Sequence, residues 1–423
     1  MIAEFTVENF RSFKEKQTFS LISTKDKELL ELNTFESEKK LSFLKSAVIY
    51  GANASGKSNF FNALLFFLNF SVLSGPRKQA KDPIETDPFA LSKQTETSPS
   101  SFEIIFVIKD DKGETRYRYG FSVDKEKVLS EYLYAVKNVR EIMLFNRTAQ
   151  DIEHTPYFKE GARSKSSVRK NCTFLSVCAQ NNGEISTKII EYFRIIEVLS
   201  GLEMFPFSYG ENIQADYKKK IVNFLKYADI QITNYEIDSI PFFSAFSDIE
   251  LSKFYKNRHP DMQINKIQYG HTYFDGETPV GEKYLDEDVE SAGTRKLFLY
   301  SRSILEALEK GIPLFIDEFD TTLHPLIIES IVKLFNSPIT NPKNAQLVIS
   351  CHAVNIMTNK LLRRDQIWFC EKDQYGATDL YSLVEYKEPV RKDSSYNKNY
   401  LQGKYGAIPY IDDILLQIGR EKE

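Results

Sequence analysis

The sequence predicts an α/β fold with a mixed β-sheet core, an antiparallel β subdomain and an inserted helical lobe. An apolar run at 46–50 leads into a glycine-rich stretch and then a helical pattern, which predicts a strand–loop–helix unit. Apolar residues at helical spacing within 184–228 predict two amphipathic helices. Alternating strand-like runs predict an antiparallel meander at 101–109, 114–123, 127–136 and 140–145.

The rest of the chain alternates between strand-like runs, irregular connections and one long helical run. Residues 2–7 and 17–21 alternate well enough to be strands, and 72–100 is rich in Ser, Pro, Thr and charge, which indicates an irregular connection. Residues 229–285 show no clear periodicity. Further along, a helical run at 295–310 and apolar strands at 313–318 and 346–352 complete the core. We therefore expect two lobes of one domain at 1–183 and 286–385, an inserted lobe at 184–285 and a C-terminal tail packed on the domain at 386–423.

Composition places the chain among globular proteins. It has 423 residues, of which 42% are hydrophobic and 27% charged. The formal net charge of −4 gives no global basic footprint, which a dedicated nucleic-acid binder usually has. We expect no signal peptide and no membrane-spanning run, and hence a cytoplasmic protein. The cysteines have no metal-ligand spacing, and we interpret them as reduced core residues: Cys172, Cys178, Cys351 and Cys370.

The stretch Gly51–Ser58, GANASGKS, fits the phosphate-loop pattern G-x-x-x-x-G-K-[ST] between a strand and a helix. Glycines let the backbone wrap a phosphate, so that successive N–H groups and the helix N-terminus point at it. Lys57 would reach the β- and γ-phosphates, and the Ser58 hydroxyl would hold Mg²⁺. The residues expected to contact the nucleotide here are Asn53, Ala54, Ser55, Gly56, Lys57, Ser58 and Asn59.

A second strand, PLFIDE at 313–318, ends in two acidic residues, a Walker B pattern with an adjoining glutamate. Asp317 is expected to hold the Mg²⁺ that Ser58 shares. Glu318 is expected to orient and deprotonate the attacking water. An ordinary strand ending in an acidic turn is the alternative, and the phosphate loop upstream favours the functional interpretation.

Two further features narrow the class of site. Ser291 and Gly293 precede a helical run, where N–H groups, a hydroxyl and the helix dipole could bind an anion. His352 ends the strand-like run 346–352, where an imidazole could hydrogen-bond a γ-phosphate. The alternatives are a helix start that binds nothing and a strand-end histidine satisfied by its surroundings.

In this order the motifs resemble those of the ABC ATPase superfamily. The resemblance implies that Ser291 and Gly293 of one protomer cap the nucleotide of the other, so that two molecules enclose two ATPs. Asp320, in the stretch FDTTLHP, matches the D-loop region. The separation of 260 residues between Lys57 and Asp317 resembles the SMC, recombination-repair and OLD-like branch, in which an insertion splits the two lobes.

Two more residues are assigned by this resemblance. The start NFRSF is similar to that branch, in which the arginine contacts a nucleotide phosphate, and this implies the role for Arg11. Gln180 ends the strand-like run TFLSVCAQ, a position that suits the Q-loop glutamine beside Mg²⁺ and water. A helix-start residue without a role is the alternative for Gln180.

Several stretches resemble the stand-alone ATPases of anti-phage systems, the RloA/AbiL type and the AriA subunit of PARIS: NFRSF, YGANASGKSNF, ESAGTRKLF, LFIDEFDTTLHP and YLQGKYGAIPYI. The resemblance implies an ATP- and Mg²⁺-dependent regulator that forms a homodimer or a higher multiple. The 71 residues after His352 contain no second acidic cluster of a metal-dependent nuclease. We therefore expect a separate effector, a Toprim-like nuclease, and a phage-encoded trigger.

Two other classes of function have less support from the sequence. A DNA-engaging repair or chromosome-organising ATPase would need a basic face, and nucleic acid is a possible partner that the net charge does not indicate. The basic residues of 146–170 could contact phosphate, although a solvated loop is the favoured interpretation: Arg163, Lys165, Arg169 and Lys170. A transporter subunit is disfavoured. The signature of transporter-type domains is longer and is followed by glutamine, whereas here Thr294 and Arg295 follow Gly293.

Overall fold

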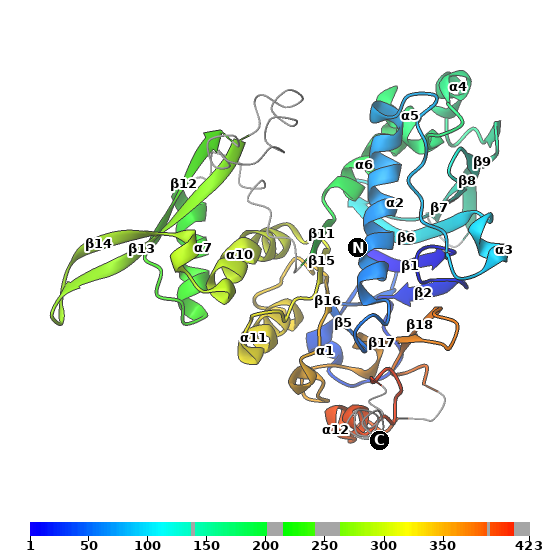
Figure 1. Ribbon diagram of the computed structural model, residues 1–423. Helices are drawn as coiled ribbons and strands as arrows, with labels where there is room; N and C mark the ends of the chain where they lie inside the picture. The colour runs from blue at the N-terminus through cyan, green and yellow to red at the C-terminus, as the bar shows by residue number, and fades with distance from the viewer. Residues whose placement is uncertain (137–139, 201–214, 242–262, 387–389, 410–423) are drawn as a thin grey trace, which may run out of the picture.

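The centre of the molecule is a mixed six-stranded sheet, as predicted (Figure 1). The computed structural model describes residues 1–136, 140–200, 215–241, 263–386 and 390–409. Neighbouring strands are parallel except at the β18 edge. The strand order is β11 (Glu197–Ser200), β15 (Leu314–Asp317), β16 (Leu347–Ser350), β5 (Ser46–Tyr50), β17 (Ile367–Lys372) and β18 (Thr378–Ser382).

Both faces of this sheet are buried, and alternate residues of each strand enter different cores. On β5, Ala47 and Ile49 face one core, whereas Val48 and Tyr50 face the other. Because side chains alternate across a strand, a continuous apolar run is what a doubly covered strand requires. Helix α2 (Lys57–Arg77) covers the first face, and α10 (Ala292–Lys310) and α11 (Pro325–Asn336) cover the second.

Helix α2 packs between the central sheet and a second sheet, and its aromatic residues fill the space (Figure 1). The Phe67 ring stacks on Phe121 with centroids 5.3 Å apart, and Phe61 meets Phe315 of β15 edge-on at 6.5 Å. By length and composition α2 could also cross a membrane, contrary to our expectation that no such run exists. However, 61% of the qualifying window is buried, so the apolar residues of α2 form core.

The second sheet is antiparallel, and the predicted meander is confirmed within it. It has seven strands, of which β1 joins the meander to the start of the chain. Their order is β10 (Asp151–His154), β9 (Glu141–Thr148), β8 (Val128–Val136), β7 (Gly113–Val123), β6 (Ser100–Asp110), β1 (Ile2–Glu8) and β2 (Gln17–Ser20). Short elements flank it: α1 (Leu30–Asn33), α3 (Lys93–Glu96), α4 (Gly161–Ser164), η1 (Lys165–Ser167) and the β3–β4 pair (Thr34–Glu36, Ser42–Leu44).

Helices α5 (Phe174–Gln180) and α6 (Glu184–Arg194) pack against α2 and close the first core. The predicted lobe boundary at residue 184 coincides with the start of α6. However, α6 contributes Ile189 and Phe193 to the first core, and β11 joins the central sheet. The part that projects from this body in Figure 1 therefore starts at α7 (Ala215–Tyr227).

The projecting part contains a three-stranded antiparallel sheet that periodicity did not reveal. Its strands are β12 (Asn234–Pro241), β13 (Gln263–Asp275) and β14 (Thr278–Asp286), and a 3-10 turn, η3 (Glu287–Val289), leads from it to α10. The predicted second helix of 184–228 is α7, and it packs on α10 beside this sheet (Figure 1). The inserted lobe is thus mixed rather than purely helical.

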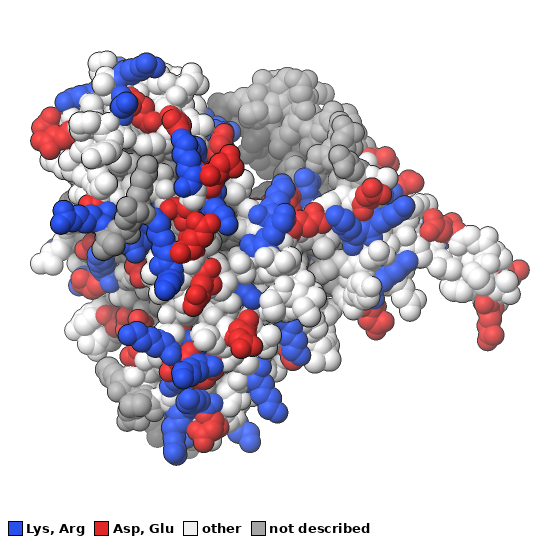
Figure 2. Space-filling view, turned by 180° about the vertical axis from the view of Figure 1, so that it is seen from behind, with Lys and Arg blue, Asp and Glu red and all other residues white. Residues whose placement is uncertain are grey.

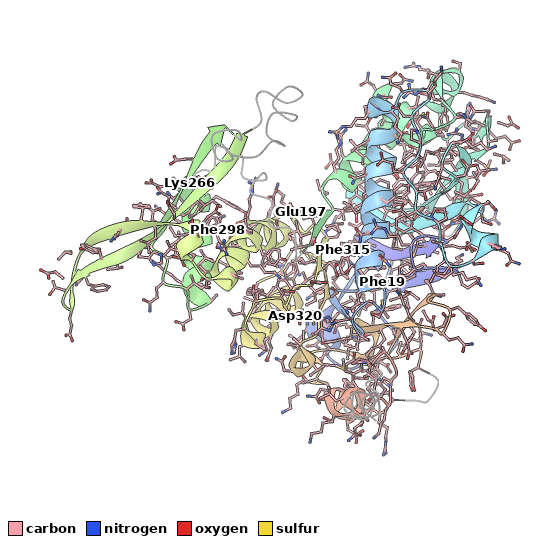
Figure 3. The ribbon with its side chains drawn as sticks, viewed as in Figure 1. Phe19, Glu197, Lys266, Phe298, Phe315 and Asp320 are labelled. Atoms are coloured by element: carbon pink, nitrogen blue, oxygen red, sulfur yellow. The ribbon has the colours of Figure 1, made fainter. Side chains whose placement is uncertain are left out.

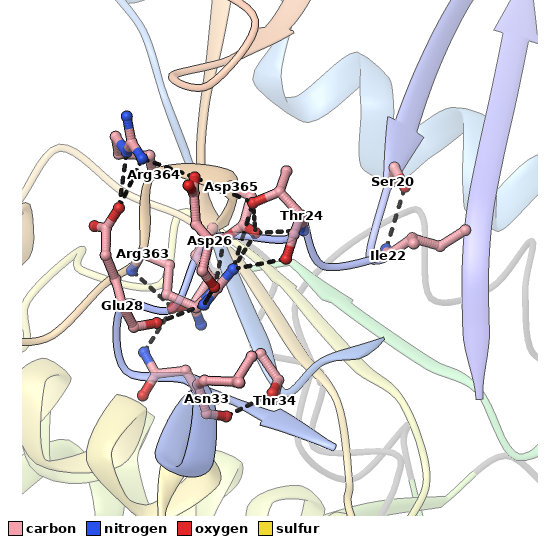
Figure 4. Close-up of polar contacts among 12 residues, drawn as sticks. Ser20, Ile22, Thr24, Asp26, Glu28, Asn33, Thr34, Arg363, Arg364 and Asp365 are labelled. Atoms are coloured by element: carbon pink, nitrogen blue, oxygen red, sulfur yellow. Dashed lines mark hydrogen bonds and ion pairs between the residues drawn. The ribbon is translucent and has the colours of Figure 1, made fainter. Parts of the chain in front are cut away.

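The described part of the C-terminal tail packs on the second core. Helix α12 (Tyr396–Leu401) inserts Tyr396 and Tyr400 there. Nearby, η5 (Arg364–Gln366) lies at the centre of a polar network, and η4 (Val354–Ile356) follows β16. Buried Arg363 donates to the backbone carbonyls of Asp26 and Glu28, which fastens the loop before α1 to the second half of the chain (Figure 4).

Candidate active site

The predicted phosphate loop connects the end of β5 to the start of α2. Gly51 has φ 156° and Gly56 has φ 112°. A Cβ on Gly56 would lie 2.2 Å from Thr378 Oγ1, and one on Gly51 would lie 2.4 Å from the carbonyl oxygen of Cys370. Only glycine fits these two positions, so the loop wraps closely with its N–H groups at the N-terminus of α2.

Lys57 is buried at the base of this loop. Its ammonium donates to the carbonyl oxygens of Gly51 at 2.9 Å and Ala52 at 3.0 Å. Burial lowers the pKa of Lys57, whereas negative charge nearby, including Asp317 and Glu318, raises it. The lysine and the two acids therefore share one site, as the two motifs predict.

The end of β15 supplies the acids, and a serine of β16 fixes them. Ser350 Oγ donates to Asp317 Oδ1 at 2.5 Å and accepts from the backbone N–H of Glu318 at 2.7 Å. Asp317 is buried and Glu318 is half-buried. The second oxygen of the Asp317 carboxylate could hold a cation, and Glu318, with φ 49°, starts the turn that follows β15.

His352 and Asp320 come together at the end of β16. The backbone N–H of His352 donates to Asp320 Oδ2 at 2.7 Å. Desolvation lowers the pKa of His352, and the charge of Lys57 lowers it further, while Asp320 and Glu318 raise it. The ring is neutral near pH 7 and can donate one N–H to a phosphate oxygen. Figure 3 shows Asp320 between the central sheet and α11.

The sheet topology explains why these residues meet. β16 lies between β5 and β15, so the phosphate loop and Asp317 are two strand spacings apart, roughly 9.5 Å. Ligands of open α/β sheets bind outside the carboxyl ends of parallel strands. A phosphate group and a cation fit across this gap, with the loop on one side and the acids on the other.

The residues also fit the group that the motifs imply. Ser55 Oγ is buried inside the loop and has no hydrogen-bond partner among the described residues, which suits a phosphate oxygen. Ser58 follows Lys57 at the first turn of α2, and oxygen ligands such as its hydroxyl and the Asp317 carboxylate are those Mg²⁺ prefers. Among the described residues, no three His, Cys, Asp or Glu side chains are placed so that they could hold a metal ion together, so phosphate and water would have to complete the coordination.

Arg11 and Asn59 lie at the outer side of the loop. Asn59 Nδ2 donates to Ser12 Oγ at 2.7 Å, which brings the NFRSF segment to the start of α2. The Arg11 guanidinium is partly exposed, and its Nε donates to Asp87 at 3.3 Å. Sequence reasoning missed Ser12 and Thr378: the Thr378 hydroxyl donates to the carbonyl of Ser55 and lies 2.8 Å from Ser12 Oγ.

The predicted signature forms the N-terminus of α10. Ser291 is the N-cap, its Oγ accepts from the N–H of Thr294 at 3.1 Å, and its side chain is exposed. A Cβ on Gly293 would lie 2.7 Å from the carbonyl oxygen of Thr322, so the helix start packs on the turn after β15. Within the described residues, neither Ser291 nor Gly293 lines the cavity beside the chain's own phosphate loop.

The prediction for Gln180 is wrong. TFLSVCAQ is not a strand: α5 ends at Gln180, and its side chain lies 2.9 Å from the Cβ position of Gly75. Gly75 is 18 residues along α2 from Lys57, a distance of about 27 Å. The strand whose end reaches Asp317 is instead β11, where Ser200 pairs with Asp317.

A cavity of about 620 Å³ opens beside the loop and His352. Its outer wall is the C-terminal tail, including Tyr400, Leu401 and Ile408. The tail motif YLQGKYGAIP is therefore placed against the first half of the phosphate loop.

The sequence matches one known protein family over most of its length. Residues 46–358, about three quarters of the chain, match the family described as "AAA domain, putative AbiEii toxin, Type IV TA system". The chain belongs to this family. The match begins at β5 and runs past His352, so it includes the phosphate loop, the acids of β15 and the start of α10.

Other comparisons are more distant. The structure is similar to the SMC head domain from Thermotoga maritima, with 12% sequence identity, a TM-score of 0.40 and coverage of 90% of this chain and 98% of that chain. No curated protein matches the sequence.

Proposed function

We propose that this family member binds ATP with Mg²⁺ and hydrolyses it. The observation that carries the proposal is the meeting of the phosphate loop with Asp317, Glu318 and His352 around one gap at the carboxyl ends of β5, β16 and β15. The acidic strand end alone would be weak evidence. Its convergence with the phosphate loop, where the carboxylates of Asp317 and Glu318 act on the charge of Lys57, supports nucleotide chemistry.

Each side chain has a distinct part in the proposed reaction. Lys57 leaves the carbonyls of Gly51 and Ala52 to bind the β- and γ-phosphate oxygens. Mg²⁺, held by Ser58 and Asp317, would neutralise charge on those oxygens. Glu318 accepts the proton of the attacking water, and neutral His352 donates to the γ-phosphate as charge builds on it.

The arrangement of α10 supports a site completed by a second copy of the chain. Ser291 is exposed at a helix N-terminus, a ready anion site, and faces outward rather than into its own loop cavity. ATP would therefore close a homodimer, and the dimer population would depend on the nucleotide state.

The biological setting is proposed from the family description and the sequence resemblance. The family's description names a putative AbiEii toxin of a type IV toxin–antitoxin system. Together with the resemblance to RloA/AbiL and AriA, this supports a cytoplasmic regulator of an anti-phage system whose ATP state controls a separate, Toprim-like nuclease effector. A phage-encoded protein would be the trigger.

A role on DNA has less support. On the face shown in Figure 2, Lys and Arg side chains are interspersed with Asp and Glu over both parts of the molecule. Nucleic-acid binding depends on several phosphate contacts made by a clustered basic surface. The defence regulator is therefore the function we put forward.

The test is mass photometry of wild type and Glu318→Gln with and without ATP and Mg²⁺, beside an ATPase assay. We expect hydrolysis by the wild type, loss of hydrolysis in Glu318→Gln and ATP-dependent dimers that persist in the variant. Lys57→Ala is the control and should neither bind ATP nor dimerise. A wild-type chain that binds ATP but stays monomeric would overturn the trans-acting site.

A further inference from the structure

Lys296, in the second turn of α10, is buried beneath the turn that follows β15. Only 3% of it is exposed. Its ammonium donates to the carbonyl oxygen of Glu318 at 2.9 Å and to that of Thr321 at 2.8 Å. A lysine is rarely buried unless its charge is satisfied, so these contacts call for an explanation.

The turn needs an external support. Glu318 has φ 49° and Thr322 has φ 69°, and each non-glycine residue in this region costs about 1–2 kcal/mol. The N–H of Glu318 is held by Ser350 of β16, and its carbonyl by Lys296 of α10. Side chains from two other elements thus fix the peptide groups on both sides of the glutamate.

The same helix contacts the turn at a second point. Gly293 packs so closely on Thr322 that a Cβ would lie 2.7 Å from its carbonyl oxygen. From Ser291 to Lys296 is about 7.5 Å along one helix. Because a helix moves as a unit, a displacement of Ser291 is transmitted to the turn that carries Glu318 and Asp320.

The charge of Lys296 also faces the site. Burial lowers the pKa of Lys296 to about 8, and the carboxylates of Asp320, Glu318 and Asp317 oppose this shift. The ammonium contacts the backbone of the turn that carries Glu318 and Asp320. A purely apolar side chain could fill this space but could not hold the two carbonyls.

We propose that Lys296 is a positioning residue that sets the Glu318 carboxylate for hydrolysis and links the signature of a protomer to that protomer's own hydrolytic turn. The inference rests on the proposed ATPase function. When Ser291 binds the nucleotide of the partner, α10 shifts, and Lys296 and Gly293 carry this shift to Glu318. Hydrolysis at one site of the dimer thereby depends on occupancy of the other.

The variant Lys296→Met removes the ammonium that makes both hydrogen bonds and keeps a side chain of similar length. We expect the Kd for ATP with Mg²⁺ to change by less than about twofold, while kcat falls about 100-fold, the range for a misplaced general base. The Hill coefficient for ATP hydrolysis, expected above one in the wild type, should fall to about one. Lys310→Met, at the exposed end of the same helix, is the matched control and should change neither quantity.

A double-mutant cycle separates positioning from general loosening. If Lys296 acts through Glu318, the variant carrying both Lys296→Met and Glu318→Gln should retain the residual hydrolysis rate that Glu318→Gln alone shows over long incubation at high enzyme concentration. Additive losses, or an unchanged kcat in Lys296→Met, would overturn the inference. If Lys296→Met does not fold, Lys296→Gln, whose shorter polar side chain replaces the ammonium, tests the same contact by the same split between kcat and Kd. Absence of hydrolysis in the wild type would instead reject the proposed function.

Discussion

At the scale of single residues, Ser350 holds the two acids of the site in register. Its hydroxyl donates to Asp317 and accepts from the N–H of Glu318. Outer partners of metal ligands commonly change metal affinity or activity by about 10- to 100-fold when removed. We expect Ser350→Ala to raise the Mg²⁺ concentration needed for half-maximal hydrolysis by that factor.

The measurement is a Mg²⁺ titration of ATPase activity at saturating ATP. Ser71→Ala is the control, because Ser71 is equally buried and donates to the carbonyl of Phe67 within α2, away from the acids. A Ser350→Ala curve that superimposes on the wild-type curve would remove Ser350 from the site.

Gly56 gives a second residue-scale prediction. Its φ of 112° and the 2.2 Å approach of Thr378 Oγ1 exclude a Cβ. Strain of about 1–3 kcal/mol at such a position corresponds to roughly a 5- to 150-fold loss of ATP affinity if the loop distorts. Isothermal titration calorimetry of Gly56→Ala should show this loss. Gly276→Ala, also at positive φ but with open space around it, should bind ATP normally.

Residues within linear motifs could be predicted, and their supports could not. Lys57, Ser58, Asp317 and Glu318 follow from spacing and from the strand or helix beside them. Ser350, Thr378 and Lys296 reach the site only because the chain folds back, and nothing in their immediate sequence distinguishes them from ordinary polar residues. Tertiary proximity is the information that a single sequence lacks.

At the scale of elements, the N-terminus of α5 depends on a buried ion pair. Glu131 accepts from the N–H groups of Phe174 and Leu175, and Arg147 donates to it at 3.3 Å. Both side chains of the pair are fully buried. Removing one partner leaves an uncompensated charge, so Arg147→Met should lower the free energy of unfolding by about 3–5 kcal/mol.

Urea unfolding followed by circular dichroism would measure this loss. Lys188→Met removes a partly exposed ion pair with Asp110 and should cost at most about 1 kcal/mol. Equal effects of the two substitutions would show that burial does not govern the strength of the Arg147 pair.

Helices and strands whose apolar residues recur with a clear period were predicted, and those whose apolar residues do not were missed. β6 to β9 alternate with a polar face and were found. α5 reads as a strand because Val177 and other apolar residues dominate its seven positions, but Thr173 caps it, its side chain accepting from the N–H of Ser176. The first six residues of β14 are exposed on both faces, so no alternation marks that strand.

At the scale of the whole molecule, the central sheet separates two cores that meet at the nucleotide site. Cys178 and Cys370 belong to the core around α2, and Cys351 to the core around α10 and α11. Cys351 follows the end of β16 and Cys370 lies on β17, on either side of the phosphate loop's strand. The thiols can therefore report on each half of the fold separately.

The cysteines should be inert in the native protein and protected further by nucleotide. All four are free and buried, and burial raises the pKa of each thiol, that of Cys370 to about 12. Since only the thiolate reacts, labelling by a disulfide reagent at pH 8 requires the fold to open.

ATP with Mg²⁺ at 100 times Kd stabilises the bound state by about 2.7 kcal/mol, which slows opening about 100-fold. Mass spectrometry of labelled peptides should show this protection for Cys351 and Cys370, and Lys57→Ala should abolish it. If the nucleotide slows Cys172 and Cys178 equally, the region of α5 opens together with the strands beside the phosphate loop; fast labelling of any cysteine in the folded chain would contradict the buried cores.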